Sequence, residues 1–161
     1  MELTPDLKNI GFCLKDMNES DLNDFLRVDK LTIQRYIDEY PDFFGNNYNL
    51  EIGTESFHQK VKFTFFKKLL LNDEVVGFMC YDRKEDKINK ISIRIIEKAQ
   101  NMGIGTLFVS HLVKLSERFS IPVYIGVIKS NPAQNLYKRL GFEFYTEEDI
   151  IYILVYNSVC T

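Results

Sequence analysis

The sequence predicts a mixed α/β domain, and three patterns indicate this fold class. First, an isoleucine-rich alternating run at residues 91–96 leads through a turn with two glycines into an amphipathic helix ending near residue 119. Second, two β-rich runs at residues 65–71 and 75–81 are joined by three polar residues, as in a hairpin. Third, residues 121–156 read as a strand, a short helix and two closing strands. Hairpins therefore come first, and a strand–helix–strand–helix–strand run follows.

The totals of the 161-residue chain are those of one domain with a full hydrophobic core. Hydrophobic residues make up 45% and charged residues 27%, which disfavours disorder. The net charge of −3 disfavours nucleic-acid binding, which usually needs a basic surplus. No apolar run reaches membrane-spanning length, and the first residues lack a signal-peptide pattern. We therefore expect neither a nucleic-acid partner nor a membrane.

The cysteines indicate a reducing, cytoplasmic location. Cys13, Cys80 and Cys160 lie far apart and are odd in number, which is unusual for a disulfide framework. None has a neighbouring Cys or His at ligand spacing, so we expect no metal site.

The first half of the chain begins with an expected strand at residues 10–15. Polar residues at 18, 20 and 21 offer N-cap oxygens to a helix that Pro41 should stop. Residues 42–62 are the least regular part of the chain. There we expect a turn at Gly45 and a helix over residues 50–61 with these side chains inward: Ile52, Phe57 and Val61.

The second half of the chain continues with a nearly all-apolar run at residues 121–128, which predicts a strand buried on both faces. Asn131 as N-cap, Pro132 at the first helical position and Gly141 just past the end define a short helix. Residues 142–145 and 150–156 close the chain as strands around an acidic turn.

The glycine turn at residues 100–106 opens a helix, and such a turn points free backbone N–H groups and the positive end of the helix dipole at an anion. A dinucleotide fingerprint needs a third glycine where Phe108 stands, and a P-loop needs a Gly-Lys-Ser/Thr triplet that the chain lacks. Taken alone, the short pattern fits an anion site about as well as it fits a turn in which glycine only relieves crowding.

A second motif, together with the first, resembles the GNAT superfamily of acyl-CoA-dependent N-acyltransferases. That superfamily carries Arg/Gln-x-x-Gly-x-Gly/Ala after its fourth strand, then a helix, a strand and an Asn–Ala–Leu–Tyr–Gly–Phe-like segment. The residues that carry the resemblance are Gln100, Gly103 and Gly105 in the first motif and Asn131, Ala133, Leu136, Tyr137, Gly141 and Phe142 in the second. The resemblance covers the whole chain. It implies one domain at residues 1–161, with about seven mostly antiparallel strands, about four helices and a splayed parallel strand pair holding the cofactor.

The resemblance also implies acetyl-CoA as cofactor and acyl donor. The pyrophosphate would lie on the turn, the pantetheine arm beside the strand at residues 93–96, and a backbone N–H near Ile95 would polarise the thioester. Tyr137 would protonate the departing thiolate as general acid, unless it is simply a core aromatic. The cofactor-binding residues implied in this way are Ile93, Ile95, Ile96, Gln100, Asn101, Met102, Gly103, Ile104, Gly105, Thr106, Asn131, Ala133 and Tyr137.

The acceptor side is less marked in the sequence. A Tyr-Ile-Asp-Glu run and a later Phe-Gly pair resemble a bacterial GNAT subgroup, although the tryptophan expected near that turn is absent. As a hypothesis, Asp38 or Glu39 binds the acceptor's ammonium group or acts as base; a solvated acidic helix end explains both residues equally well.

The function expected from these motifs is acetyl transfer from acetyl-CoA to a primary amine, by direct attack in a ternary complex. The alternative is a GNAT-fold module that binds or senses acyl-CoA without turnover, and a third reading is a protein scaffold without coenzyme affinity. The sequence leaves several acceptors open: polyamines, aminoglycosides, amino acids, protein N-termini and lysines. The slightly negative net charge of the chain favours a cationic acceptor. The aromatic middle region is compatible with a homodimer.

Overall fold

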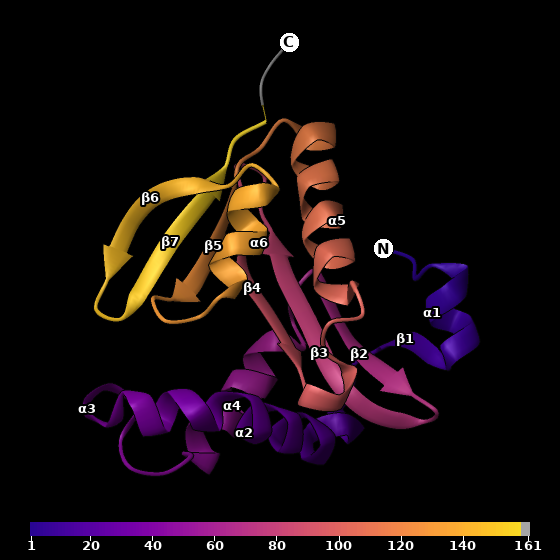
Figure 1. Ribbon diagram of the computed structural model, residues 1–161, viewed down its shortest axis with the longest axis vertical. Helices are drawn as coiled ribbons and strands as arrows, with labels where there is room; N and C mark the ends of the chain where they lie inside the picture. Colours follow the sequence, from indigo (N-terminus) through magenta and orange to yellow (C-terminus); the bar gives the residue numbers. More distant parts are fainter. Residues whose placement is uncertain (159–161) are drawn as a thin grey trace. The chain divides into compact units, whose positions relative to one another are not determined.

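Seven strands form one sheet in the computed structural model, which describes residues 1–158 (Figure 1). The strand order is β1-β2-β3-β4-β5-β7-β6. The pairs β1–β2, β5–β7 and β6–β7 are antiparallel, whereas β4 and β5 run parallel with Ile88 opposite Val123. The mixed α/β fold with a mostly antiparallel sheet of seven strands is therefore confirmed; the splay of the parallel pair stays a prediction.

The chain divides into two compact units, which are described separately. The N-terminal unit comprises Glu2–Cys80 and Ser92–Met102, and the C-terminal unit comprises Met1, Tyr81–Ile91 and the chain from Gly103 onward. Strands β3 and β4 therefore contribute residues to both units.

The N-terminal unit contains most of the helices. Its elements are α1 (Pro5–Ile10), β1 (Phe12–Asp16), a 3-10 turn (Glu19–Asp21), α2 (Leu22–Glu39), α3 (Pro41–Phe44), α4 (Leu50–Lys60), β2 (Phe65–Leu71), the first part of β3 (Glu74–Arg83), the second part of β4 (Ile88–Ile95) and a 3-10 turn (Glu97–Ala99). Phe25 and Phe57, both fully buried, pack at a ring distance of 5.2 Å, and Phe25 lies 4.5 Å from Phe78. This aromatic cluster joins α2 and α4 to the sheet strands of the same unit.

Local residue preferences explain most boundaries in this unit. The hairpin between β2 and β3 turns at Asn72 and Asp73, whose φ angles of 48° and 69° suit the two-residue turns that asparagine and aspartate favour. Helix α2 ends at Glu39 and Pro41 begins α3, as expected from proline geometry. The first strand starts at Phe12 rather than at residue 10, because residues 5–10 form a helix closed by Gly11 at a φ of 113°.

Two further expectations for this unit need revision. The described chain has six α-helices rather than about four, and the additional ones are the short α1 and α3. In α4, Phe57 is buried as expected, but Ile52 is 64% exposed, so the inward placement of Ile52 was wrong.

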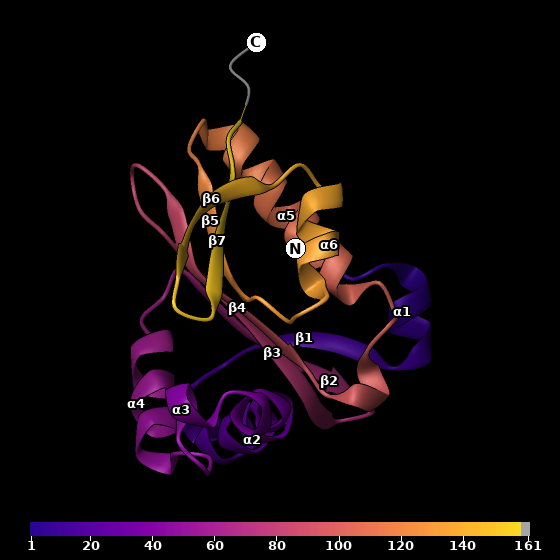
Figure 2. The same cartoon turned by 60° about the vertical axis from the view of Figure 1, so that its left-hand side comes forward.

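The C-terminal unit contains α5 (Ile104–Phe119), β5 (Val123–Ile128), α6 (Ala133–Arg139), β6 (Glu143–Glu148) and β7 (Ile151–Tyr156). Strands β5, β7 and β6 lie side by side in that order (Figures 1 and 2). The apolar stripe of α5 is buried as its spacing predicts, at Ile104, Phe108 and Leu112.

The expectation that β5 is buried on both faces was wrong. Its burial alternates: Val123, Ile125 and Val127 are buried, whereas Gly126 is exposed and the half-buried Tyr124 ring lies 5.2 Å from the exposed Tyr145 ring. Antiparallel neighbours often leave one strand face open to water, which an apolar run alone does not reveal.

Two expected absences can be compared with the described part of the chain. No helix within residues 1–158 has the length and apolar character needed to cross a membrane. Within the same residues, no three His, Cys, Asp or Glu side chains cluster in a way that could hold a metal ion. Cys13 and Cys80 form no disulfide, and Cys160 lies outside the described residues.

Candidate functional site

The glycine turn follows β4 through a 3-10 turn at Glu97–Ala99 that the sequence pattern did not predict. The Gln100 side chain reaches back to β4, where its Nε2 donates to the Ile95 carbonyl at 2.7 Å. Asn101 and Gly103 both adopt left-handed backbone conformations, with φ angles of 59° and 78°. Asparagine and glycine are the residues that tolerate this region best. The turn is therefore tied to the end of β4 and shaped by its residue types.

The first turn of α5 is suited to an anion. Gly103 is its N-cap and provides no side-chain cap, and the first helical turn contains no acidic residue. The first hydrogen bond of the helix runs from the Leu107 N–H to the Gly103 carbonyl oxygen, at 3.1 Å. The backbone N–H groups before Leu107 therefore lack acceptors within the helix. These donors and the helix dipole suit an anionic group such as a phosphate, and the pyrophosphate-binding role of the turn stays a prediction.

Strand β4 ends in a close contact with β3 that depends on a glycine. A Cβ added to Gly77 would lie 2.6 Å from the Arg94 carbonyl oxygen and 3.3 Å from the Ile95 Cα. The Ile96 N–H then donates to the Val76 carbonyl at 2.9 Å. Gly77 therefore fixes the path of the strand that contains Ile93, Ile95 and Ile96, and the sequence analysis did not single it out.

The second motif lies in the C-terminal unit. The Asn131 Oδ1 accepts the Ala133 N–H at 2.9 Å, so its side chain caps the start of α6 as expected. The helix itself begins at Ala133, so Pro132 occupies the N-cap position and not the first helical position that we expected. Tyr137 is only 4% exposed, and its ring lies 6.1 Å from that of Phe142. The packed position agrees with a core aromatic, and the acid role of Tyr137 stays a prediction. So does the assembly of both motifs into one coenzyme site.

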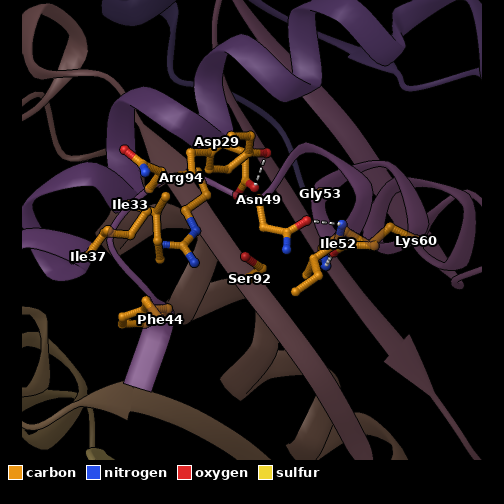
Figure 3. A pocket seen from close by; sticks show the side chains of 13 residues that line it. Asp29, Ile33, Ile37, Phe44, Asn49, Ile52, Gly53, Lys60, Ser92 and Arg94 are labelled. Atoms are coloured by element: carbon orange, nitrogen blue, oxygen red, sulfur yellow. Dashed lines mark hydrogen bonds between the residues drawn. The ribbon is translucent and has the colours of Figure 1, made fainter. Parts of the chain in front are cut away.

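A cavity of about 200 Å³ opens in the N-terminal unit, built from α2, the end of α3, the segment between α3 and α4, α4 itself and β4 (Figure 3). The sequence analysis missed it. Its lining combines four large apolar side chains with several polar and charged ones: Asp29, Ile33, Ile37, Phe44, Asn47, Tyr48, Asn49, Ile52, Gly53, Ser56, Lys60, Ser92 and Arg94.

Helix periodicity explains which residues of α2 reach this cavity. Asp29, Ile33 and Ile37 recur every four residues and therefore share one face. Asp38 and Glu39 are exposed and do not line the cavity; Asp38 accepts a hydrogen bond from Gln34 Nε2 at 2.9 Å on the surface. The acceptor role assigned to them stays a prediction. The signal that could have found Asp29 is its i, i+4, i+8 relation to two isoleucines.

Hydrogen bonds hold two of the charged lining residues in place. The Tyr48 hydroxyl donates to Asp29 Oδ2 at 2.8 Å, and Lys60 Nζ donates to Ser56 Oγ at 2.7 Å. Burial, followed by the bond to the Asp29 carboxylate, raises the pKa of Tyr48, so the phenol stays protonated and keeps donating. Burial also lowers the pKa of Lys60; the nearby Cys80 and Asp29 oppose this lowering, and the Arg94 guanidinium adds to it.

Comparison with known proteins identifies the family. The profile of the family described as "Acetyltransferase (GNAT) family" matches residues 30–142. The chain is 30% identical over 76 residues to the [Ribosomal protein bS18]-alanine N-acetyltransferase of Haemophilus influenzae. That match covers 47% of this chain and 52% of the relative, so the chain spans about half the length of the curated relative that it matches.

Solved structures share the fold over nearly the whole chain. A PaiA N-acetyltransferase from Thermoplasma acidophilum in complex with coenzyme A has a TM-score of 0.67 at 14% identity, covering 91% of this chain and 99% of that one. The ribosomal-protein-S18-alanine N-acetyltransferase of Escherichia coli has a TM-score of 0.66 at 16% identity, with 93% and 96% covered. Since the family profile spans well over half of its residues, the chain belongs to the acetyltransferase (GNAT) family.

Proposed function

We propose that the protein transfers the acetyl group of acetyl-CoA to a primary amine. The observation that carries this proposal is the start of α5: a left-handed Gly103 N-cap, no side-chain cap, no acidic residue in the first turn, and a preceding loop bonded to β4 through Gln100. Such a helix start binds phosphate through its backbone. Membership of the acetyltransferase (GNAT) family supports coenzyme A as the phosphate-bearing ligand.

The chain's own residues would position the acyl donor, which supplies the thioester to be broken. The N–H groups of Ile104, Gly105 and Thr106 would hold the pyrophosphate. The strand segment at Ile93 to Ile96 would run beside the pantetheine arm, and the Asn131 carboxamide would add a polar contact. Backbone donors suit this task because they need no long cationic side chains.

The reaction balances as follows. The acceptor ammonium first loses one proton, and the amine nitrogen then attacks the thioester carbonyl carbon. The C–S bond breaks and an amide that keeps one N–H forms. The departing thiolate gains a proton from Tyr137, and the second proton lost by the nitrogen returns to the Tyr137 phenolate. The net products are the acetamide, the free thiol of coenzyme A and one proton. Holding the two reactants together would supply most of the acceleration, with smaller polar assistance.

The remaining parts of the proposal concern context. The relative from Haemophilus influenzae is named for acetylating an alanine of a ribosomal protein, so a protein amine belongs to the acceptors to be tested. We propose a cytoplasmic, single-domain enzyme that needs no metal, and a homodimer is the oligomeric state to be tested.

Release of free thiol from acetyl-CoA tests the proposal. With a panel of polyamines, amino acids and peptides, we expect acceptor-dependent thiol release. Tyr137→Phe should cut turnover while leaving coenzyme A affinity nearly unchanged, and Tyr145→Phe, at the exposed β6, should change neither. Tight coenzyme binding without thiol release from any acceptor would favour a sensing module instead. Absence of coenzyme binding would refute both functions.

A further inference from the structure

The charges that line the cavity of the N-terminal unit do not cancel. Among its lining residues, Asp29 is the acidic one, whereas Lys60 and Arg94 are basic. The cavity therefore has a formal surplus of one positive charge, although the whole chain has a net charge of −3. The local charge acts on a ligand inside the cavity more strongly than distant surface charges, which solvent and salt screen.

Arg94 has no protein partner for its guanidinium group. Within residues 1–158, its side chain makes no ion pair and no hydrogen bond, although Arg94 is half-buried in the cavity wall. Asp29 is bonded to the Tyr48 hydroxyl instead, and Lys60 to the Ser56 hydroxyl. Half-burial removes part of the hydration of this cation without supplying an opposite charge, which favours binding of an anionic group beside it.

The side chains around Arg94 define what else the ligand must carry. In Figure 3, Arg94 and Ser92 enter from β4, while Ile33 and Ile37 from α2 lie beside Arg94. Phe44 and Ile52 add further apolar surface to the lining. A guanidinium group fits a carboxylate through two parallel hydrogen bonds, and isoleucines fit an aliphatic chain.

We propose that this cavity binds the amine acceptor and selects a small aliphatic amine that bears a carboxylate, as a free α-amino acid does. This inference rests on the proposed acetyl transfer. Arg94, helped by Lys60, binds the carboxylate; Asp29, held by Tyr48, faces the ammonium group; and the isoleucines contact the aliphatic side chain. A cavity of about 200 Å³ is small for a ligand pocket and suits a ligand of this size. Polyamines and aminoglycosides would bring further positive charge to a cavity that already has a surplus of it.

Matched ligands test the carboxylate directly. The probes are L-leucine, L-leucinamide, 3-methylbutylamine, spermidine and a tetrapeptide amide with a free N-terminus. Each is assayed for kcat/KM by thiol release and, separately, for binding by calorimetry. We expect kcat/KM for leucine to exceed that for leucinamide by about 10-fold or more, as for a hydrogen-bonded ion pair. Arg94→Gln should abolish the preference, whereas Arg35→Gln, an exposed arginine of α2 outside the cavity, should keep it.

The outcomes separate the two proposals. Acetylation of spermidine or the peptide in preference to leucine, or equal losses for leucine and leucinamide in Arg94→Gln, would overturn the carboxylate inference and leave acetyl transfer standing. Leucine binding that Arg94→Gln removes, without thiol release from any probe, would support the anion site and refute acetyl transfer. Failure of leucine to bind or react, with turnover of another amine, would overturn the inference alone.

Discussion

The glycine turn and the cavity of the N-terminal unit are two ways to build an anion site. The turn uses backbone N–H groups at the start of α5, where Gly103 has a φ of 78° and no side chain caps the helix. The cavity uses side chains from the stretch that runs from α2 to α4 and from the distant strand β4, with Arg94 as its unpaired cation. A backbone site depends on conformation and leaves a glycine pattern in the sequence. A side-chain site depends on tertiary packing, and its sequence signal is weaker: here it is only the helix phase that Asp29 shares with two isoleucines.

The largest expected effect comes from straining the backbone site. Gly103→Val places a β-branched residue at a φ of 78°, where nothing lies within 4 Å of the added Cβ, so strain rather than a clash acts. A cost of about 1–2 kcal/mol favours another loop conformation and moves the N–H donors. We expect coenzyme A affinity to fall by about 10-fold or more, measured by calorimetry, while leucine binding is unchanged.

Gly45→Val is the matched control for this experiment. Gly45 also has a positive φ, 82°, with nothing within 4 Å of an added Cβ, but it follows Phe44 of the cavity lining. Gly45→Val should weaken leucine binding and leave the affinity for coenzyme A unchanged. If both valine variants lowered both affinities equally, the two sites would not be independent, and the contrast drawn between them would fail.

The next effect concerns Gly77, which supports both sites through β4. Its added Cβ would lie 2.6 Å from the Arg94 carbonyl oxygen, so Gly77→Ala forces the backbones of β3 and β4 apart. Overpacking of this kind costs about 1–3 kcal/mol, or a fall in Tm of about 2–12 °C for a chain of this size. Gly126→Ala, whose Cβ would meet Ile151 at an ordinary 3.4 Å, should leave Tm nearly unchanged in the same thermal scan. An unchanged Tm for Gly77→Ala would show that the close approach is not required.

A smaller effect is expected on the pH dependence of ligand affinity. The cavity contains a lysine that can lose its charge, Lys60, and the glycine turn contains no such group. Burial lowers the pKa of Lys60 below 10.5, so its charge is lost at a lower pH than that of an ordinary lysine. Burial raises the pKa of the nearby Cys80 thiol to about 11, so Cys80 stays mainly protonated over most of this range. Binding of 4-methylpentanoate, an aliphatic carboxylate without an amine, should weaken as pH rises from 7 toward 10.5. Coenzyme A binding should stay level.

The effect of Lys60 on folding stability changes with pH in the opposite direction to its effect on ligand binding. Because the folded pKa of Lys60 is depressed, the charged form is disfavoured in the fold, and its unfavourable contribution is relieved as pH rises through the folded pKa. Lys60→Gln should remove both pH dependences, and Lys30→Gln, an exposed lysine of α2, should remove neither. A pH-independent affinity for 4-methylpentanoate in the wild-type protein would exclude Lys60 from the anion site.

The same contrast explains what the sequence could predict. The turn was predictable because Gly103 reports a backbone requirement, a positive φ before the helix, and Gly141 did the same for the end of α6. The cavity was not, because Asp29 and Arg94 are ordinary charged residues until α2 and β4 pack within one unit. Gly77 also escaped notice, since a glycine in a strand indicates a close approach only when the approaching chain is known. Asp38 and Glu39 were chosen for their charge, whereas helix phase decides which side chains reach the cavity.

The smallest expected effect separates the cavity's hydrogen bonds from those of the surface. Tyr48→Phe removes the 2.8 Å bond to Asp29 and leaves that carboxylate without its donor, which should lower the free energy of unfolding by about 1 kcal/mol. Tyr156→Phe removes a similar phenol–carboxylate bond, 3.1 Å long, to the solvent-exposed Glu117, where water replaces the donor. Chemical denaturation should therefore detect a loss for Tyr48→Phe and almost none for Tyr156→Phe. If both variants lost the same amount, Asp29 would be as well solvated as a surface carboxylate, and its placement opposite the acceptor's ammonium group would lose its physical basis.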